Sequence, residues 1–165
     1  EIWREIPGER DETIFTATWY EGLFALEDGD PMDRGFWDRI IATRMATGPA
    51  LETARKAGQI GSSLDAELDL YCSDALREAL ERLGDELRFA LIVSEVRLHA
   101  VAERPEDASA TDLDGLAVRV SASGHPKCVR CWHHRADVGS HAEHPELCGR
   151  CVENVAGAGE TRHFA

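Results

Sequence analysis

The chain has 165 residues, of which 18 are basic and 31 acidic, so its formal net charge is −13 at pH 7. That balance excludes a protein that binds polyanions through diffuse positive charge alone. Its longest apolar run, residues 89–93, is far shorter than a membrane span, and its first residues lack the features of a signal peptide, so we expect part of a longer cytoplasmic polypeptide that contacts no membrane.

Residues 1–32 are predicted to connect this chain to a neighbouring part of the polypeptide. Turn signals occur at residues 6–8 and 28–31. Between them, four apolar residues recur at three- and four-residue spacing: Phe15, Trp19, Leu23 and Phe24. This spacing indicates a short helix or an extended arm that docks on a neighbour, and it also fits a part of the local core.

A long helix is predicted from Asp33, its N-cap, to about Gly58. One face of this helix is apolar and comprises Phe36, Trp37, Ile40, Ile41, Leu51 and Ala54. We expect a kink or break between Met45 and Pro49, because proline has no N–H and its ring crowds the carbonyl four residues earlier.

Residues 59–123 are predicted to contain three strands and two short helices. Apolar residues alternate with polar ones in the strands, at residues 64–70, 96–100 and 116–121. In the first strand the polar residues are acidic, so we expect one buried face and one wet face. Helical spacing follows at residues 74–83 and 85–93, and residues 103–115 form an acidic loop. Because no regular βαβ repeat is present, we predict an α+β fold with helices packed on a small sheet of about three strands.

The composition changes near Ser123-Gly124. Residues 125–165 contain five basic and five acidic side chains, so the whole charge of −13 belongs to the 124 residues before them. Six of the seven histidines and four of the five cysteines also lie in the last 41 residues. We therefore predict one domain at residues 33–123 and a separate small module at residues 124–165.

The module contains a C-x2-C-x16-C-x2-C motif formed by Cys128, Cys131, Cys148 and Cys151. Two such knuckles supply the four thiolates of a tetrahedral zinc site, and a site filled by four thiolates is structural rather than catalytic. The alternatives are two disulfides or one redox-active C-x-x-C, although neither a secretion signal nor a thioredoxin-like βαβ context accompanies the motif. Nearby side chains that could replace a cysteine are His133, His134, Asp137, His141 and His144, and we expect the histidines to be solvated in loops.

Several sequence words resemble bacterial isoleucyl-tRNA synthetases. Cys131-Trp132 and residues 148–157 are similar to the C-terminal end of that family, and four upstream words follow in the same order, at residues 14–16, 19–24, 60–66 and 84–89. The resemblance covers nearly all of the chain. One departure from the family pattern is Thr47-Gly48-Pro49, which lies in the predicted long helix.

The resemblance implies the C-terminal region of a class I aminoacyl-tRNA synthetase, an isoleucine-tRNA ligase that uses ATP. Residues 1–32 would connect to its anticodon-binding helical domain, residues 33–123 would form an α+β junction domain, and residues 124–165 would bind zinc and contact tRNA. The implied partners are the tRNA for isoleucine and the remainder of the synthetase, which we expect to be a monomer.

The chain lacks the features that such enzymes use for catalysis. It has no His-x-Gly-His element and no glycine-rich phosphate loop, and its only lysines are Lys56 and Lys127. No catalytic residue is therefore expected here. ATP and Mg²⁺ would bind only in the parent enzyme's catalytic domain, and the fragment alone should be inactive.

Three residues of the module are candidates for RNA contact. Trp132 follows a knuckle and can present its indole for base stacking, while Arg130 and Arg150 can reach a phosphate or a base edge. The alternative for Trp132 is a lid packed over the metal. Two other functions fit the same motif, namely the zinc finger of a DNA-repair glycosylase and a purely structural zinc cap that never touches RNA.

Overall fold

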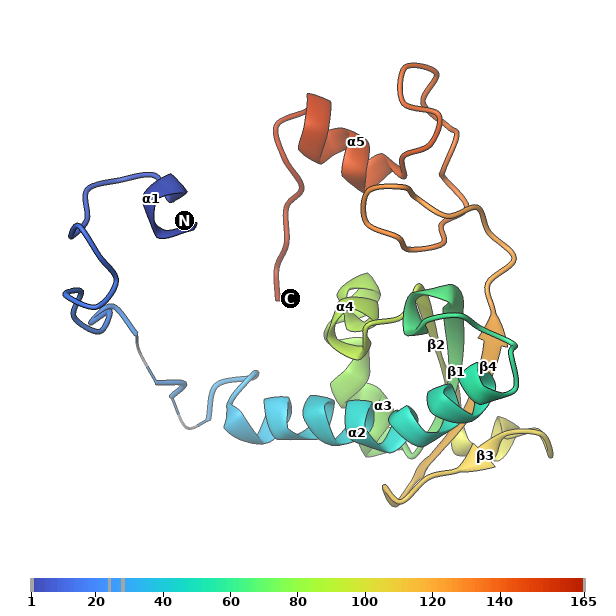
Figure 1. The fold of residues 1–165 in the computed structure, drawn as a ribbon. Helices are drawn as coiled ribbons and strands as arrows, with labels where there is room; N and C mark the ends of the chain where they lie inside the picture. The colour runs from blue at the N-terminus through green and yellow to red at the C-terminus, as the bar shows by residue number, and fades with distance from the viewer. Residues whose placement is uncertain (1, 24, 28, 165) are drawn as a thin grey trace.

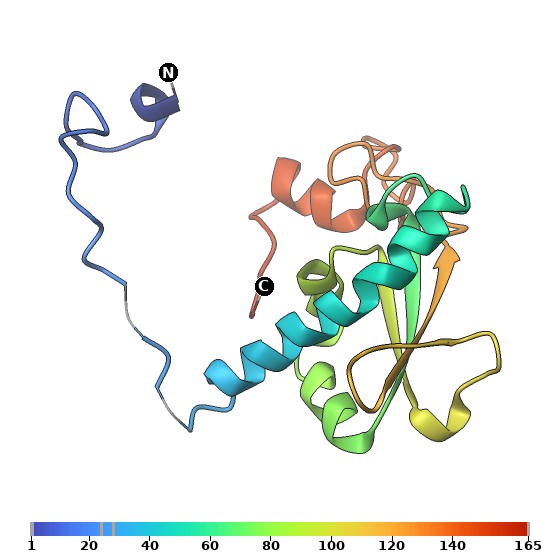
Figure 2. The same ribbon diagram turned by 60° about the horizontal axis from the view of Figure 1, so that its bottom comes forward.

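The computed structural model describes residues 2–23, 25–27 and 29–164 (Figures 1 and 2). Its helices are α1 (Ile2–Glu5), α2 (Arg34–Lys56), α3 (Asp74–Glu81), α4 (Leu87–Leu91) and α5 (Gly149–Ala156). Its strands are β1 (Ala66–Cys72), β2 (Glu95–Ala100), β3 (Ser109–Ala110) and β4 (Leu116–Ala122), and short 3-10 turns occupy Ser63–Asp65, Gly84–Glu86 and Val101–Glu103. Among the helices described, none is long and apolar enough to cross a membrane.

The strands form one mixed sheet in the order β2-β1-β4-β3. Strand β1 is parallel to β2 and antiparallel to β4, so that Leu68 lies opposite Val96 on one side and Val120 on the other. Because parallel neighbours need a crossover connection, α3 and α4 lie between β1 and β2 in the chain. The predicted α+β class is confirmed, with a fourth strand of two residues inside the acidic loop.

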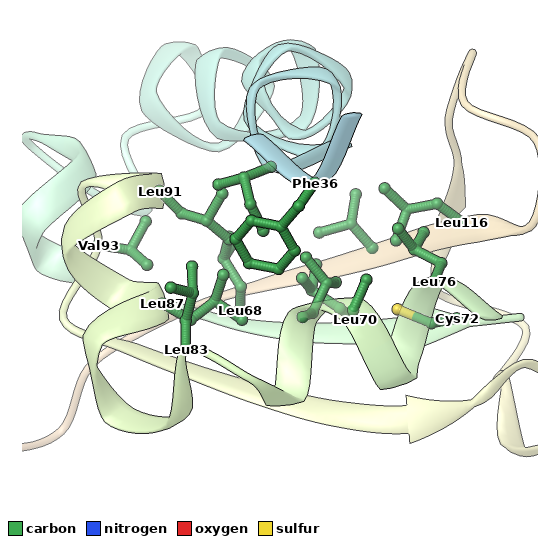
Figure 3. Packing of buried hydrophobic residues seen from close by; sticks show 14 residues of the cluster. Phe36, Leu68, Leu70, Cys72, Leu76, Leu83, Leu87, Leu91, Val93 and Leu116 are labelled. Carbon is green, nitrogen blue, oxygen red and sulfur yellow. The ribbon is translucent and has the colours of Figure 1, made fainter. Parts of the chain in front are cut away.

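Helices α2, α3 and α4 contribute to a single core against one face of this sheet (Figure 3). Residues 68, 70 and 72 of β1 project into that core, as the two-residue period of a strand requires. The core comprises Phe36, Ile40, Leu68, Leu70, Cys72, Leu76, Ala79, Leu80, Leu83, Leu87, Leu91, Val93, Leu116 and Val118.

Helix α2 begins and ends close to the predicted positions. The carboxylate of Asp33 accepts a hydrogen bond from the backbone N–H of Phe36 at 2.9 Å, which confirms the predicted N-cap. The predicted break is absent, because the helix continues through Pro49. Met45, whose carbonyl lacks the proline N–H, is 72% exposed, so water can replace the missing donor.

The buried face of α2 differs from the predicted one in two respects. Ile41 is 57% exposed, while Thr43 and Thr47 are fully buried. Each threonine hydroxyl donates a hydrogen bond to a carbonyl of the preceding turn, that of Arg39 at 2.9 Å and that of Arg44 at 3.0 Å. Burial of these polar groups is tolerated because their hydrogen bonds are satisfied within the helix.

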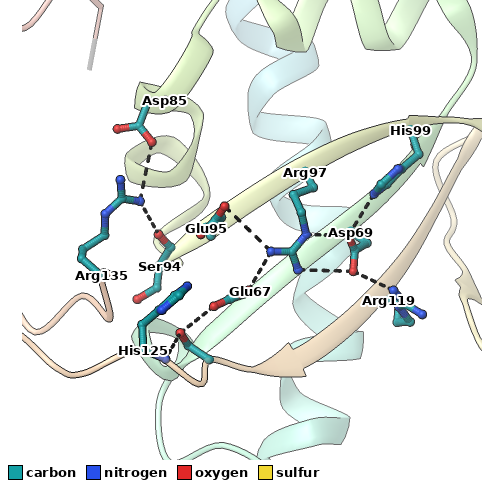
Figure 4. A network of polar contacts seen from close by, with 11 residues as sticks. Glu67, Asp69, Asp85, Ser94, Glu95, Arg97, His99, Arg119, His125 and Arg135 are labelled. Carbon is teal, nitrogen blue, oxygen red and sulfur yellow. Dashed lines mark hydrogen bonds and ion pairs between the residues drawn. The ribbon is translucent and has the colours of Figure 1, made fainter. Parts of the chain in front are cut away.

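The second face of β1 is not wet, and that expectation was wrong. Glu67 is only 8% exposed and Asp69 only 4%. Two arginines and a histidine from the neighbouring strands converge on the Asp69 carboxylate (Figure 4). Arg97 Nε lies at 2.8 Å and His99 Nε2 at 2.9 Å, both from β2, and Arg119 Nη2 of β4 lies at 3.1 Å. The long arginine side chains cover the acidic face and pair with it, so the carboxylates are both buried and charged.

Residues 2–23 and 25–27 form an extended arm, in which the one helical turn is α1 (Figure 1). Phe15 and Trp19 are each 94% exposed, and Leu23 is 82% exposed. These residues are therefore not part of the local core, and they do not form the short helix that their spacing allowed. Phe24, the fourth residue of that pattern, lies outside the described residues.

We expect Asp69→Asn to lower the free energy of unfolding at pH 7 by about 2–3 kcal/mol, because it leaves two arginines without their shared counter-ion. Burial raises the pKa of Asp69, but hydrogen bonds from Arg97, His99 and Arg119 outweigh it and hold the pKa well below its usual range. Stabilisation by this carboxylate is therefore complete above its unfolded-state pKa of about 4 and is lost as the pH falls further.

Urea unfolding at pH 7 and at pH 3 measures both effects of this substitution, since the difference between wild type and Asp69→Asn should shrink at the lower pH. A matched control is Asp107→Asn, which removes a 67% exposed partner 3.8 Å from Arg119 and should cost less than about 1 kcal/mol. Equal losses for the two variants would contradict the assigned role of Asp69.

Candidate metal centre

The first knuckle is a tight turn that brings Cys128 and Cys131 together. The backbone N–H of Trp132 donates to the carbonyl of Cys128 at 2.9 Å, and the N–H of Cys128 donates to the carbonyl of His133 at 2.9 Å. Trp132 adopts the left-handed backbone conformation, with φ of 66°. That conformation is unfavourable for a residue with a Cβ, so the turn is held by its hydrogen bonds.

The second knuckle forms the start of helix α5. Cys148 is the N-cap residue and Cys151 lies in the first turn. The backbone N–H of Gly149 donates to Asp137 Oδ2 at 2.8 Å, and a Cβ at residue 149 would lie only 2.9 Å from that oxygen. The exposed Asp137 therefore fixes the knuckle from outside, and glycine leaves room for it.

The four cysteine sulfurs converge on one point, within 4.8 Å of one another. None is in a disulfide, and the sulfurs of Cys131 and Cys148 are 3.8 Å apart. A disulfide would bring two sulfurs to about 2.05 Å. Zn–S bonds of about 2.3 Å in a tetrahedron place the sulfurs about 3.8 Å apart, so the arrangement has the dimensions of a zinc site with four cysteine ligands.

The module has almost no other core. Its buried cluster consists of Cys128, Cys148 and Cys151, and the partly buried side chains packed against them are those of Cys131, Val138 and Leu147. Two aliphatic side chains are far too few to stabilise about forty residues by hydrophobic burial. The sulfurs are thus the centre of the module in both position and energy.

The sulfurs cannot all be thiolates at neutral pH without a cation. Burial and the neighbouring Cys131 sulfur raise the pKa of Cys148 to about 12. Burial also disfavours the charged form of Cys131, but His133 and, to a smaller extent, Arg150 stabilise its thiolate and lower its pKa to about 5. One thiolate therefore forms readily and opposes ionisation of its neighbours, which is the electrostatic situation that a divalent metal relieves.

Polar contacts attach the module to the sheet domain, the part of the chain that contains α2–α4 and β1–β4. The backbone N–H of His134 donates to Ser94 Oγ at 2.7 Å, and Lys127 Nζ lies 3.1 Å from Asp65 Oδ1. Arg135 Nη1 lies 3.4 Å from the carbonyl of Ser94 and 3.6 Å from Asp85 Oδ1 (Figure 4). These contacts link the module to the residue before β1, to the turn before α4 and to the residue before β2.

Two histidines expected in solvated loops are partly or fully buried. His133 is 9% exposed and lies edge-on to Phe89, with ring centroids 5.5 Å apart. The side chain of His134 is 18% exposed and lies 3.3 Å from Asp65. Among the described residues, no group of potential metal ligands combines a histidine with the four cysteines.

The three candidate RNA-contacting residues differ in exposure. Trp132 is 61% exposed, whereas a ring packed over the sulfurs would be mostly buried. Arg130 is exposed, and its Nη1 lies 3.5 Å from Cys151 Sγ. The side chain of Arg150 is only 19% exposed and pairs with Glu160 at 3.0 Å.

Sequence reasoning did not find the residues that hold Arg150 in place. Besides Glu160, the ring of Phe89 lies against its guanidinium, 5.0 Å from the ring centroid. Phe89 precedes Arg150 by about sixty residues, and nothing in the sequence pattern connects them. Glu160 is one of five acidic residues in the module. The fold alone determines that it is the one that pairs with Arg150.

Comparison with known proteins gives matches of two kinds, to one family and to individual proteins. Residues 126–154 match the family described as "Zinc finger found in FPG and IleRS". Over its full length, the chain is 58% identical to the isoleucine–tRNA ligase of Halorhodospira halophila, 56% identical to that of Thioalkalivibrio sulfidiphilus and 55% identical to that of Nitrosococcus oceani. In each case the chain spans 18% of the length of the ligase.

The finger alone does not distinguish between the two proteins in its description, because the same match names both. The similarity outside the finger does distinguish them, since it extends over the arm, the sheet domain and the module at 55–58% identity. The chain is therefore homologous, over its whole length, to one part of the isoleucine–tRNA ligases.

Proposed function

We propose that the chain is the C-terminal, zinc-binding and tRNA-contacting part of an isoleucine–tRNA ligase. The observation that carries this proposal is the full-length similarity to such ligases together with four converging cysteines. Residues 1–32 are the connection to the anticodon-binding helical domain, residues 33–123 the junction domain and residues 124–165 the zinc module. The parent enzyme is cytoplasmic and monomeric in this proposal.

The proposed metal is one structural zinc ion bound by Cys128, Cys131, Cys148 and Cys151. Four thiolate ligands fill the tetrahedral coordination of Zn²⁺ and leave no position for a substrate or a water molecule. The ion stabilises the fold of a module whose buried cluster is mainly sulfur. ATP and Mg²⁺ belong to the catalytic domain of the parent enzyme, outside this chain.

The proposed RNA contact centres on Trp132. Its ring is available for stacking on an unpaired base, and the exposed Arg130 can donate to a phosphate. Arg150 can contact RNA only if its guanidinium uses some N–H donors for Glu160 and others for the RNA. Because residues 1–124 carry the whole negative charge, most of the affinity for tRNA must come from the remainder of the synthetase.

The second candidate function is a structural zinc cap that never touches RNA. The contacts from His134 to Ser94 and from Lys127 to Asp65 favour it, since they attach the module to the sheet domain. The two functions differ in what they predict for Trp132, because a cap has no use for an exposed ring.

Chelation of zinc should unfold residues 125–165 and leave the core of residues 33–123 intact, because binding of a structural metal and ordering of its module are coupled. Elemental analysis should first find one zinc per chain. Limited proteolysis after addition of a chelator should then cleave the module in addition to the exposed arm, and addition of zinc should restore protection of the module. A metal-free protein with a protease-resistant module would contradict the proposed zinc centre.

The isolated chain should form no aminoacyl-adenylate and charge no tRNA, because it contains no element that binds ATP. Isoleucine-dependent pyrophosphate exchange measures the first reaction directly. The parent enzyme provides the positive control. Exchange activity that co-purifies with the 165-residue chain would overturn the assignment of catalysis to another domain.

Replacing Trp132 by alanine in the parent enzyme should weaken transition-state binding in tRNA charging by about 1–3 kcal/mol, the contribution of one base stack. Zinc content and pyrophosphate exchange should be unchanged, since activation of isoleucine occurs on a different domain. Trp132→Phe is the matched control and should retain most of the activity. Loss of zinc, or unfolding of the module with normal tRNA binding, would instead support the structural cap.

A further inference from the structure

The two knuckles share a feature beyond their cysteines, because each has an arginine directly before its second cysteine. The words are Cys128-Val129-Arg130-Cys131 and Cys148-Gly149-Arg150-Cys151. Arg130 Nη1 lies 3.5 Å from the sulfur of Cys151, the second cysteine of the opposite knuckle. The guanidinium of Arg150 lines one hollow with Cys131 and Cys148 and favours the thiolate of Cys131, again the second cysteine of the opposite knuckle. Each knuckle therefore contributes an arginine to the sulfurs of the other.

The two arginines lie next to a negative charge, that of the four thiolates, which a zinc ion would cancel only in part. Four thiolates around Zn²⁺ have a formal charge of −2, and three of the four cysteines are at most 2% exposed. Water is thus unable to solvate most of that charge. The guanidinium groups of Arg130 and Arg150 offset part of this charge, although Glu160 shares the charge of Arg150. Hydrogen bonds from charged donors are also shorter and stronger than those from neutral ones.

The two arginines are not equally constrained. Arg150 pairs with Glu160 at 3.0 Å, lies over the ring of Phe89 and has a side chain only 19% exposed. Arg130 is exposed, and in the described part of the chain no carboxylate pairs with it. Solvent therefore weakens the contact of Arg130 more than that of Arg150.

We propose that Arg130 and Arg150 are positioning residues of the zinc centre, each of which holds the thiolate of the opposite knuckle and offsets the negative charge of the metal–thiolate group. The inference rests on the zinc binding proposed above and assigns these side chains a role that is independent of RNA. A guanidinium has five N–H donors, so a contact with sulfur leaves donors for a nucleic acid.

The test is the zinc affinity of the 165-residue chain, measured by competition with a chromophoric chelator. Arg150→Met keeps an unbranched side chain but removes its charge and its donors. It should raise the zinc dissociation constant about 10–100-fold, as other losses around metal ligands do. Arg130→Met should have a smaller effect. Arg150→Lys, which keeps the charge, should recover part of the affinity.

Arg135→Met is the matched control, because it makes the same change within the module at a side chain that contacts Asp85 and Ser94. Its zinc affinity should equal that of wild type, and circular dichroism at saturating zinc should show that all variants are folded. Wild-type affinity in Arg150→Met, or an equal loss in Arg135→Met, would overturn the inference. A wild-type chain that binds no zinc would instead remove the zinc centre, and this inference with it.

Discussion

Strand β1 determines how the rest of the molecule is assembled. On one face, Leu68 and Leu70 receive the side chains of all three covering helices. On the other face, Glu67 and Asp69 are buried beneath arginines of the neighbouring strands. Asp65, just before the strand, accepts Lys127 of the zinc module. A change in the register of β1 by one residue would exchange the two faces and place carboxylates in the apolar core.

The zinc module is organised by a different principle from the sheet domain. The sheet domain excludes water with fourteen buried residues contributed by helices and strands. The module has mainly sulfur in its interior, and its chain has few regular hydrogen bonds outside α5. In the proposed zinc-bound form, its order comes from bonds between the metal and the four cysteines and from side chains such as Asp137 that fix the knuckles.

Local features of the fold were predictable from the sequence, and long-range features were not. Asp33 specifies the start of α2 through a hydrogen bond to a residue three positions away, and the spacing of the cysteines specifies their convergence. The burial of Asp69 depends on Arg97 and Arg119, which are 28 and 50 residues distant. Strand periodicity indicates two faces but does not reveal that arginines will cover the acidic one.

The same distinction applies to the candidate site. The ligand set follows from two short words, whereas the environment of Arg150 depends on Phe89 and Glu160, which only the fold brings to it. Pro49 shows the converse case, because a proline is a strong local signal for a helix break and yet the helix continues through it. Helix α2 is continuous there because its buried face packs on the sheet while the affected carbonyl lies on the exposed side.

Trp132 has a left-handed backbone conformation, which a tryptophan adopts at a cost in stability. A residue with a Cβ loses about 1–2 kcal/mol in that conformation, and a glycine would not. Tryptophan therefore makes the knuckle less stable than the simplest alternative would, and its 61% exposed ring gains little from packing within the chain. The module thus sacrifices some of its own stability to display an aromatic surface beside its four cysteines.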